Sequence, residues 1–151
     1  MSHAIHGKDD GRSDIVWRTT TASSDSFVIW YGAVRTDPIV GPGGDFKVAA
    51  VGDFDGDGQS DLYFLSSANH AVIWYSAGTG GRTLDVGTLD PSWTVIAAGN
   101  FTTDPTRTDL YVHTSLNQLL VLPGGLPANA QVEAVLSDPT YRIVGVGSFD
   151  F

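Results

Sequence analysis

The feature that most constrains the fold is an internal repeat, because three stretches of the chain share one pattern at a nearly constant spacing. Each stretch starts with an aromatic residue, continues with mostly apolar residues and reaches a glycine, at residues 46–52, 93–99 and 141–147. Successive copies are offset by 47 and 48 residues. A fixed period of this length is typical of folds that stack one supersecondary unit several times.

Two further segments repeat in the same units. An aspartate opens an apolar run at residues 14–17, 61–64 and 109–112. A second apolar run lies at residues 28–31 and 72–75 and, more weakly, at 119–122. Val, Ile, Tyr, Phe and Trp dominate these runs and favour β-strands, and turn residues separate the runs. In the central unit we predict four strands, at residues 46–51, 62–66, 71–75 and 83–89.

Four short antiparallel strands in a period of 40–50 residues are typical of a β-propeller blade. A parallel β-helix has a shorter period, and a helical bundle has a 3.6-residue periodicity. We therefore predict an all-β chain with three blades per chain, in a single propeller segment over residues 1–151. The repeats cover about 9–52, 53–99 and 100–147.

The two ends of the chain are expected to complete one another. Residues 141–146 form a first strand with no blade after it, and the first unit lacks a convincing first strand. The strand at 141–146 can close the first blade of its own chain or of another copy. Three blades would leave sheet faces and edges exposed, so we predict a cyclic homodimer with a six-bladed ring. The alternative is a fragment of a longer propeller.

The loop at residues 53–61 concentrates acidic residues. Asp53, Asp55, Asp57 and Asp61 occupy loop positions 1, 3, 5 and 9, Gly58 allows a sharp turn at position 6, and Gln59 at position 7 offers its backbone carbonyl. Ca²⁺ binds six to eight hard oxygen ligands, and four close carboxylates repel one another unless a cation lies between them. The spacing predicts a Ca²⁺ site, and the alternative is a polar hairpin without metal.

The run at residues 51–62 closely resembles the FG-GAP/VCBS repeat, which occurs in integrin α-chain propellers, in bacterial exported proteins and in some fungal lectins. The resemblance covers essentially the whole chain, although only the central unit has the full loop. It implies a propeller that holds Ca²⁺ between the first two strands of a blade. The side-chain ligands would be Asp53, Asp55, Asp57 and Asp61, with a carbonyl ligand from Gln59.

The other two loops depart from this pattern. The third loop has one extra residue and no turn glycine, and it keeps Asn100, Asp104 and Asp109 as a weaker candidate site. Asn100 also opens a formal glycosylation sequon, for which a structural role of the asparagine is the favoured interpretation. The first loop is split between the two ends of the chain. We hypothesise a composite Ca²⁺ site across the ring seam, made of Ser148, Asp150, Asp10, the carbonyl of Arg12, and Asp14.

Composition excludes several classes of protein. Seventeen acidic against eight basic residues give a net charge of −9, which disfavours nucleic-acid binding. The lack of cysteine excludes disulfides, zinc–thiolate sites and cysteine nucleophiles. No apolar run reaches the roughly 18 residues that span a bilayer. No signal peptide is visible, and we expect an extracellular, secreted protein whose signal is not part of this chain; a cytosolic chain is the alternative.

The recurring aromatic residues allow two interpretations. Phe46, Trp93 and Tyr141 recur at the first strand, and Trp30 and Trp74 at the third. Aromatic rings stack on sugars, but they also fill the space between blades, and we favour packing for all five. We also expect Trp17 to lie in the core.

No catalytic motif is present, so we predict a non-enzymatic module for binding or scaffolding, with a glycan or a protein as ligand. The alternatives are an accessory propeller of a larger secreted enzyme or toxin, and a purely structural or engineered repeat unit.

Overall fold

The computed structural model describes residues 4–5, 14–20, 25–31, 34–35, 42–76, 82–138 and 140. These residues form β-strands joined by turns and short 3-10 segments, with no α-helix among them. The predicted all-β class is therefore confirmed. No helix in these ranges has the length and the apolar character needed to cross a bilayer.

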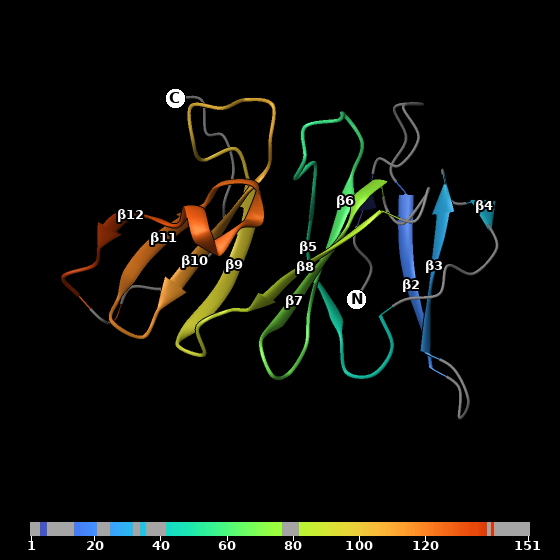
Figure 1. The fold of residues 1–151 in the computed structure, drawn as a ribbon, viewed down its shortest axis with the longest axis horizontal. Helices are drawn as coiled ribbons and strands as arrows, with labels where there is room; N and C mark the ends of the chain where they lie inside the picture. The colour runs from blue at the N-terminus through green and yellow to red at the C-terminus, as the bar shows by residue number, and fades with distance from the viewer. Residues whose placement is uncertain are drawn as a thin grey trace.

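The strands form three antiparallel sheets that follow one another along the chain (Figure 1). The first sheet contains β1 (Ala4–Ile5), β2 (Asp14–Thr20), β3 (Asp25–Tyr31) and β4 (Val34–Arg35). The second contains β5 (Lys47–Gly52), β6 (Asp61–Leu65), β7 (His70–Trp74) and β8 (Thr83–Thr88). The third contains β9 (Trp93–Gly99), β10 (Asp109–Thr114), β11 (Gln118–Leu122) and β12 (Gln131–Val135). In the second and third units the prediction of four antiparallel strands is confirmed, with boundaries in the second unit that differ by one residue.

The first sheet consists mainly of its two long strands, because β1 and β4 have two residues each. We expected no first strand in this unit, but β1 pairs with β2 through Ala4↔Ile15 and Ile5↔Asp14. That expectation is corrected, since a short first strand is present. The predicted closing strand at residues 141–146 lies outside the described residues.

The pairing register also corrects the alignment of the third unit. Leu62 pairs with Trp74 in the second sheet, and Leu110 pairs with Leu122 in the third. Leu122 is therefore the counterpart of Trp74, and the segment equivalent to residues 72–75 is 120–123 rather than 119–122. The error arose because an unbroken Leu/Val run carries no aromatic marker of register.

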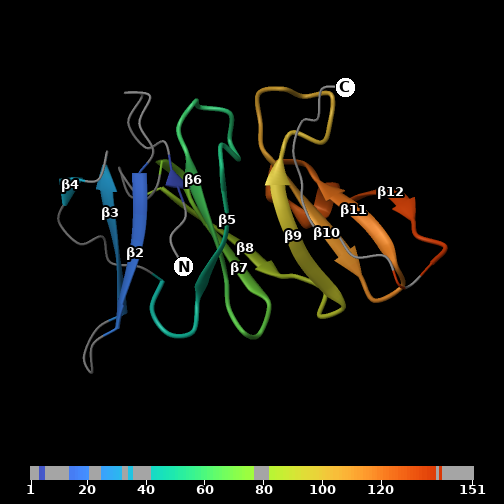
Figure 2. The ribbon, with the colours of Figure 1, turned by 180° about the vertical axis from the view of Figure 1, so that it is seen from behind.

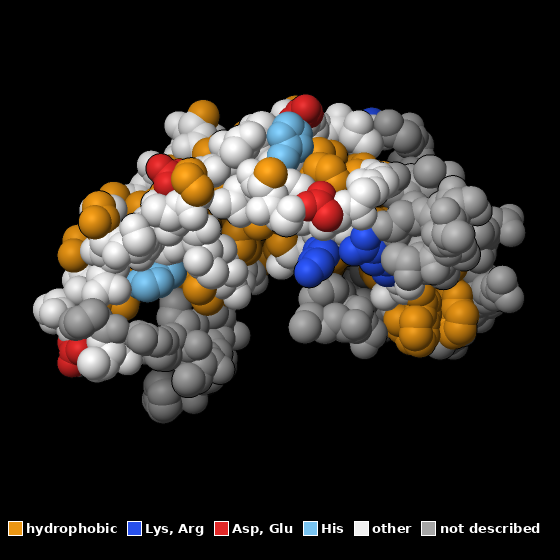
Figure 3. All heavy atoms as spheres, turned by 90° about the horizontal axis from the view of Figure 1, so that it is seen from below, with side chains coloured by type: hydrophobic (Ala, Val, Ile, Leu, Met, Phe, Trp, Pro, Cys, Tyr) orange, Lys and Arg blue, Asp and Glu red, His pale blue; other side chains and the backbone are white. Residues whose placement is uncertain are grey.

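The three sheets lie side by side with the second in the middle, as the two opposite views agree (Figures 1 and 2). The first strands are neighbours, because β5 contacts both β1 and β9. The molecule curves into an open arc (Figure 3), and its described strands close no ring.

Two apolar clusters hold the sheets together. Side chains of the first and second sheets form one, made of Val16, Phe27, Ile29, Leu62, Phe64 and Trp74. Side chains of the second and third sheets form the other, which includes Tyr63, Ile73, Leu110, Val112 and Leu122. Successive side chains of a strand point to opposite faces, and β6 is buried on both: Leu62 and Phe64 face the first sheet, and Tyr63 faces the third.

Most recurring aromatic residues take part in this packing. The Phe64 ring lies 4.8 Å from Phe27 and 5.0 Å from Trp74 (ring centroids). Phe46 and Trp93 are half-buried against the two clusters. The expectation for Trp17 is wrong, because this side chain is 43% exposed. It lies on the face of the first sheet that points away from the second sheet, with its ring 5.0 Å from that of Trp30. Tyr141 lies outside the described residues.

Candidate metal centre

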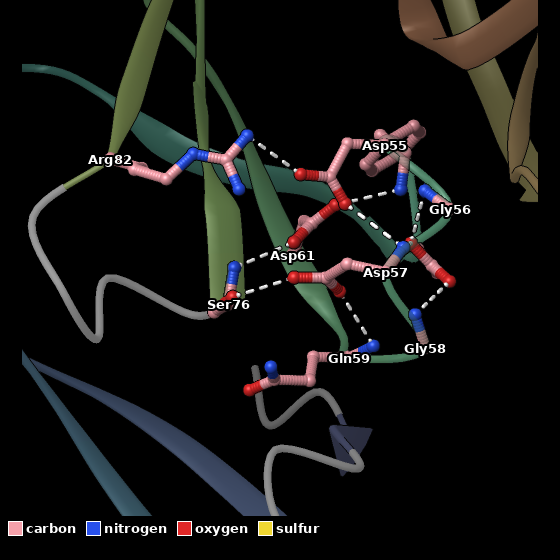
Figure 4. A network of polar contacts seen from close by, with 10 residues as sticks. Asp55, Gly56, Asp57, Gly58, Gln59, Asp61, Ser76 and Arg82 are labelled. Atoms are coloured by element: carbon pink, nitrogen blue, oxygen red, sulfur yellow. Dashed lines mark hydrogen bonds and ion pairs between the residues drawn. The ribbon is translucent and has the colours of Figure 1, made fainter.

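The acidic loop joins β5 to β6 and turns on two glycines. Gly56 and Gly58 have φ angles of +82° and +83°, in the left-handed region that side chains with a Cβ rarely adopt. The sharp turn predicted at Gly58 is confirmed, and Gly56 adds a second one. These turns fold the loop back so that its acidic residues meet at the start of β6 (Figure 4).

Three carboxylates converge in this loop. Asp53, Asp55 and Asp61 each have an oxygen within 4.8 Å of the others. Asp57 lies beside this group: one of its oxygens accepts the N–H of Gln59 at 2.8 Å and the other accepts the hydroxyl of Ser76 at 3.1 Å. The structure thus brings together three of the four predicted side-chain ligands. The carbonyl of Gln59 as a ligand stays a prediction.

Asp61 is the most buried member of the group, with 0% of the residue exposed. Its Oδ2 accepts the N–H of Phe54 at 2.7 Å, and its Oδ1 accepts the N–H of Ser76, also at 2.7 Å. Burial raises the pKa of Asp61 to about 6, although these two hydrogen bonds oppose the shift, and the charges of Asp55 and Asp57 raise it further. Burial and the two neighbouring charges therefore disfavour the ionised form of Asp61, which a bound cation would favour.

The carboxylate of Asp53 organises the turn itself. Its Oδ1 accepts the N–H groups of Gly56 at 2.7 Å and Asp57 at 3.1 Å, and its Oδ2 accepts that of Gly58 at 2.8 Å. A short acidic side chain that binds the following backbone in this way stabilises a tight turn. These bonds use both lone pairs of Oδ1, and Oδ2 keeps one for a cation.

The backbone of Asp53 ties the loop to the third sheet. Its N–H donates to Thr108 Oγ1 at 2.9 Å, and its carbonyl accepts the N–H of Thr108 at 2.6 Å. The preceding residue, Gly52, has no room for a side chain, because an added Cβ would lie 2.4 Å from Thr108 Cγ2. The loop is therefore part of the junction between two sheets.

Among the described residues, one cation forms an ion pair with the group. Arg82 Nη2 lies 2.9 Å from Asp55 Oδ2 (Figure 4). The guanidinium also stands over the Tyr75 ring, 4.7 Å from its centroid. Three ionised carboxylates against one guanidinium leave two negative charges. A divalent cation would balance them, and hard oxygen donors of this kind suit Ca²⁺.

The third loop has a buried aspartate but no converging group. Asp109 accepts the N–H groups of Phe101 and Thr102 at 3.0 Å each and that of Gly124 at 3.3 Å. Asp104 is exposed, and hydrogen bonds from Thr106 lower its pKa. Asn100 Nδ2 donates to the carbonyl of Pro105 at 3.3 Å, which gives the asparagine the structural role that we favoured. Over the described ranges, Asp53, Asp55 and Asp61 are the one group of three side chains able to hold a metal.

The composite site across the seam stays a prediction. Asp14 begins β2, while Asp10, Arg12, Ser148 and Asp150 lie outside the described residues.

Sequence reasoning missed Ser76, Arg82 and Thr108. Ser76 and Arg82 flank the β7–β8 connection, and Thr108 belongs to the neighbouring unit. The repeat contains one weak signal for Thr108, because the residue before each buried aspartate of β6 and β10 is a hydroxyl residue, Ser60 or Thr108.

The comparisons with known proteins give no match: no family model, no curated protein and no solved structure aligns with the chain at a significant level.

Proposed function

We propose that the chain is a non-enzymatic, calcium-stabilised β-propeller module of the FG-GAP/VCBS type, which binds or scaffolds an extracellular glycan or protein. The observation that carries the proposal is the convergence of Asp53, Asp55 and Asp61 in a glycine-turned loop between the first two strands of a four-stranded unit.

The ligand chemistry favours Ca²⁺ over other divalent ions. The group contains carboxylate oxygens and no nitrogen or sulfur donor, whereas Zn²⁺ sites are built mainly from Cys and His. Mg²⁺ requires a nearly ideal octahedron, while Ca²⁺ accepts irregular sets of six to eight oxygens. Asp57 and the carbonyl of Gln59 would complete the set with water. The site would be of the weaker, extracellular class, because Arg82 already neutralises part of its charge.

The role of the ion would be structural. The carboxylate of Asp61 is buried at the start of β6, and Asp53 is bonded through its backbone to Thr108 of the third unit. A cation bound between Asp53 and Asp61 would remove the repulsion among the carboxylates and hold the loop against β5 and β6. Binding to the folded state alone stabilises a protein by about 2.7 kcal/mol when the free ligand is at 100 times its Kd.

The propeller arrangement is supported by three features of the strands. Each sheet is antiparallel with its strands in chain order, the sheets lie side by side, and β5 contacts β1 and β9. Neighbouring first strands are expected around the axis of a propeller. The open arc would then be part of a ring (Figure 3).

Isothermal titration calorimetry with Ca²⁺ tests the metal site. We expect uptake by the wild-type protein and none by the Asp53→Asn/Asp55→Asn variant, with Asp104→Asn as the matched control that binds as wild type does. Folding of each variant is checked by circular dichroism. Well-folded wild-type protein that takes up no Ca²⁺ would remove the basis of the proposal.

Screening on a glycan array separates the two ligand classes. Calcium-dependent binding to a defined sugar would identify a lectin, and its absence would leave protein scaffolding as the function.

A further inference from the structure

The pairing registers identify equivalent positions in the three sheets. In the first sheet, Ile15 pairs with Trp30, and Trp17 pairs with Val28. The equivalent pairs in the second sheet are Leu62 with Trp74 and Phe64 with Val72. In the third sheet, Leu110 pairs with Leu122 and Val112 with Leu120. Because side chains alternate between faces, each set of four occupies the same face of its sheet, which we call the leading face.

The leading face is buried wherever another sheet precedes it. Leu62 and Phe64 are fully buried and Trp74 is 7% exposed, all packed against the first sheet. Leu110, Val112 and Leu122 are fully buried against the second sheet. The chain therefore makes the same kind of contact twice.

Among the described strands no sheet precedes the first one, and its leading face is only partly covered, since Val28 on this face is 7% exposed. Trp17 is 43% exposed where its counterpart Phe64 is fully buried, and Trp30 is half-buried where Trp74 is nearly closed off. The two indole rings lie 5.0 Å apart at 51°. A pair of large aromatic rings at the surface is typical of a contact site.

The third sheet carries aromatic residues at the equivalent positions of its opposite face, where the neighbouring Leu119 and Val121 are 8% and 1% exposed. Tyr111 is the counterpart of Tyr63 and is half-buried, and it stacks on Phe101 with ring centroids 4.8 Å apart. The equivalent residues Phe54 and Tyr63 also contact one another, with ring centroids 5.5 Å apart and a larger interplanar angle of 55° against 29°. Phe54 and Tyr63 belong to the cluster that joins the second sheet to the third, and Tyr63 donates to the carbonyl of Gly125 at 3.1 Å. Phe101 and Tyr111 thus repeat the pair that receives a leading face within the chain.

We propose that the Trp17–Trp30 face of one copy docks on the Phe101–Tyr111 face of a second copy, so that two such contacts close a ring of six sheets. The contact continues an interface that the chain already makes twice, between equivalent positions. The inference rests on the propeller arrangement proposed above and does not require the metal. A head-to-tail contact that closes after two copies gives a cyclic dimer.

Light scattering after size-exclusion chromatography tests the contact. The wild-type chain of 16.0 kDa should run at twice that mass, about 32 kDa. Trp17→Arg and Tyr111→Arg should each give monomers with unchanged circular dichroism. Leu116→Arg, which replaces a hydrophobic residue that is 74% exposed in the β10–β11 turn, is the control and should stay dimeric. Should Trp17→Arg fail to fold, Trp17→Thr is the milder variant for the same measurement.

Mixing the two monomeric variants tests the head-to-tail geometry. The Trp17→Arg variant still has an unaltered Phe101–Tyr111 face, and the Tyr111→Arg variant still has an unaltered Trp17–Trp30 face. These two faces can dock on one another, so the mixture should form a weak dimer through one contact. A dimer that survives Tyr111→Arg but not Trp17→Arg would indicate a Trp-to-Trp contact and overturn the proposal. A wild-type monomer at tens of micromolar, or an open series of larger species, would overturn it too.

Calcium titration of the Trp17→Arg monomer separates this inference from the proposed function. Uptake by the monomer with the wild-type affinity would show that the loop at residues 53–61 binds metal without the ring. Loss of the dimer and loss of metal binding are therefore distinguishable failures.

Discussion

The loop at residues 53–61 and the loop at residues 100–109 occupy the same place in successive units, between the first and second strands. Each ends in a buried aspartate, Asp61 or Asp109, that accepts the N–H of a phenylalanine in its own loop. Each aspartate also accepts an N–H from 15 residues further along, from Ser76 or Gly124. The buried aspartate is thus an architectural residue that needs no metal.

The two loops differ in what surrounds that aspartate. In the central loop Asp53 and Asp55 converge on it, whereas the third loop has Asn100 and Thr102 at those positions. Thr102 donates its N–H to Asp109, while Asp104 is bonded to Thr106 at the surface. The repeated aspartate therefore explains the hairpin, and the added acids explain the candidate metal site.

The largest effect is expected from removing either buried carboxylate. Asp109→Ala leaves three buried or half-buried N–H groups without their acceptor, which should lower the free energy of unfolding by about 3–5 kcal/mol. Asp61→Ala leaves two N–H groups without their acceptor and should lower the free energy of unfolding by about 2–4 kcal/mol when a chelator is present. Urea unfolding measures both, with the exposed Asp104→Ala as a control within about 0.5 kcal/mol of wild type. An Asp109→Ala protein as stable as Asp104→Ala would contradict the architectural role.

A loop exchange should transfer metal binding. Replacing residues 100–109 with the sequence of residues 53–61 should add one Ca²⁺ per chain and stabilise the protein by about 2.7 kcal/mol at 100 times the Kd. Calorimetric stoichiometry is the measurement. The control is the same exchange with asparagine at the two positions taken from Asp53 and Asp55. An unchanged stoichiometry in folded protein would mean that the loop sequence is not sufficient.

The metal-free protein should become less stable as the pH rises through the pKa of Asp61. That pKa is raised to about 6 in the folded state from 3.8, so the folded state binds the proton more tightly than the unfolded state does. Between pH 4 and 6 the free energy of unfolding falls with rising pH, and it should be about 1 kcal/mol higher at pH 5 than at pH 7.5. Urea midpoints in chelator measure this, and Asp61→Asn should abolish the difference. Calcium affinity should change in the opposite sense and weaken below pH 6.

The smallest effect is expected at Arg82. Arg82→Gln removes a guanidinium that competes for Asp55 Oδ2, so calcium affinity should rise several-fold. Stability in chelator should change by less than about 1 kcal/mol, because the arginine side chain is largely exposed. Lys47→Gln, on the exposed side of β5, is the control of equal charge change. Weaker calcium binding in Arg82→Gln would show that the arginine positions Asp55 rather than competes for it.

The repeat was enough to predict the strands of the second unit to within one residue, because β-branched or aromatic residues fill the strands and turn residues separate them. It was not enough for the register of β11, where the leucines at 119, 120 and 122 fit either face. Nor did it show that Trp17 is exposed, because its burial depends on whether a neighbouring sheet covers that face.

Sequence reasoning predicted only those residues of the candidate site that lie within one loop. Asp53, Asp55 and Asp61 lie within nine residues, and their spacing is visible in the sequence. The contacts of Ser76 and Arg82 depend on the β7–β8 pairing, in which Trp74 lies opposite Thr83. The contact of Thr108 depends on how two sheets pack, and no local pattern encodes that distance.

The close fit of Gly52 and Asp53 against Thr108 has a mechanical consequence. Only the Thr108 side chain lies between Gly52 and the neighbouring unit, and Asp53 and Thr108 exchange a hydrogen bond in each direction, so a relative movement of the second and third sheets at this contact would disturb the acidic loop. Binding of an ion in that loop would then make the junction between the second and third sheets more rigid.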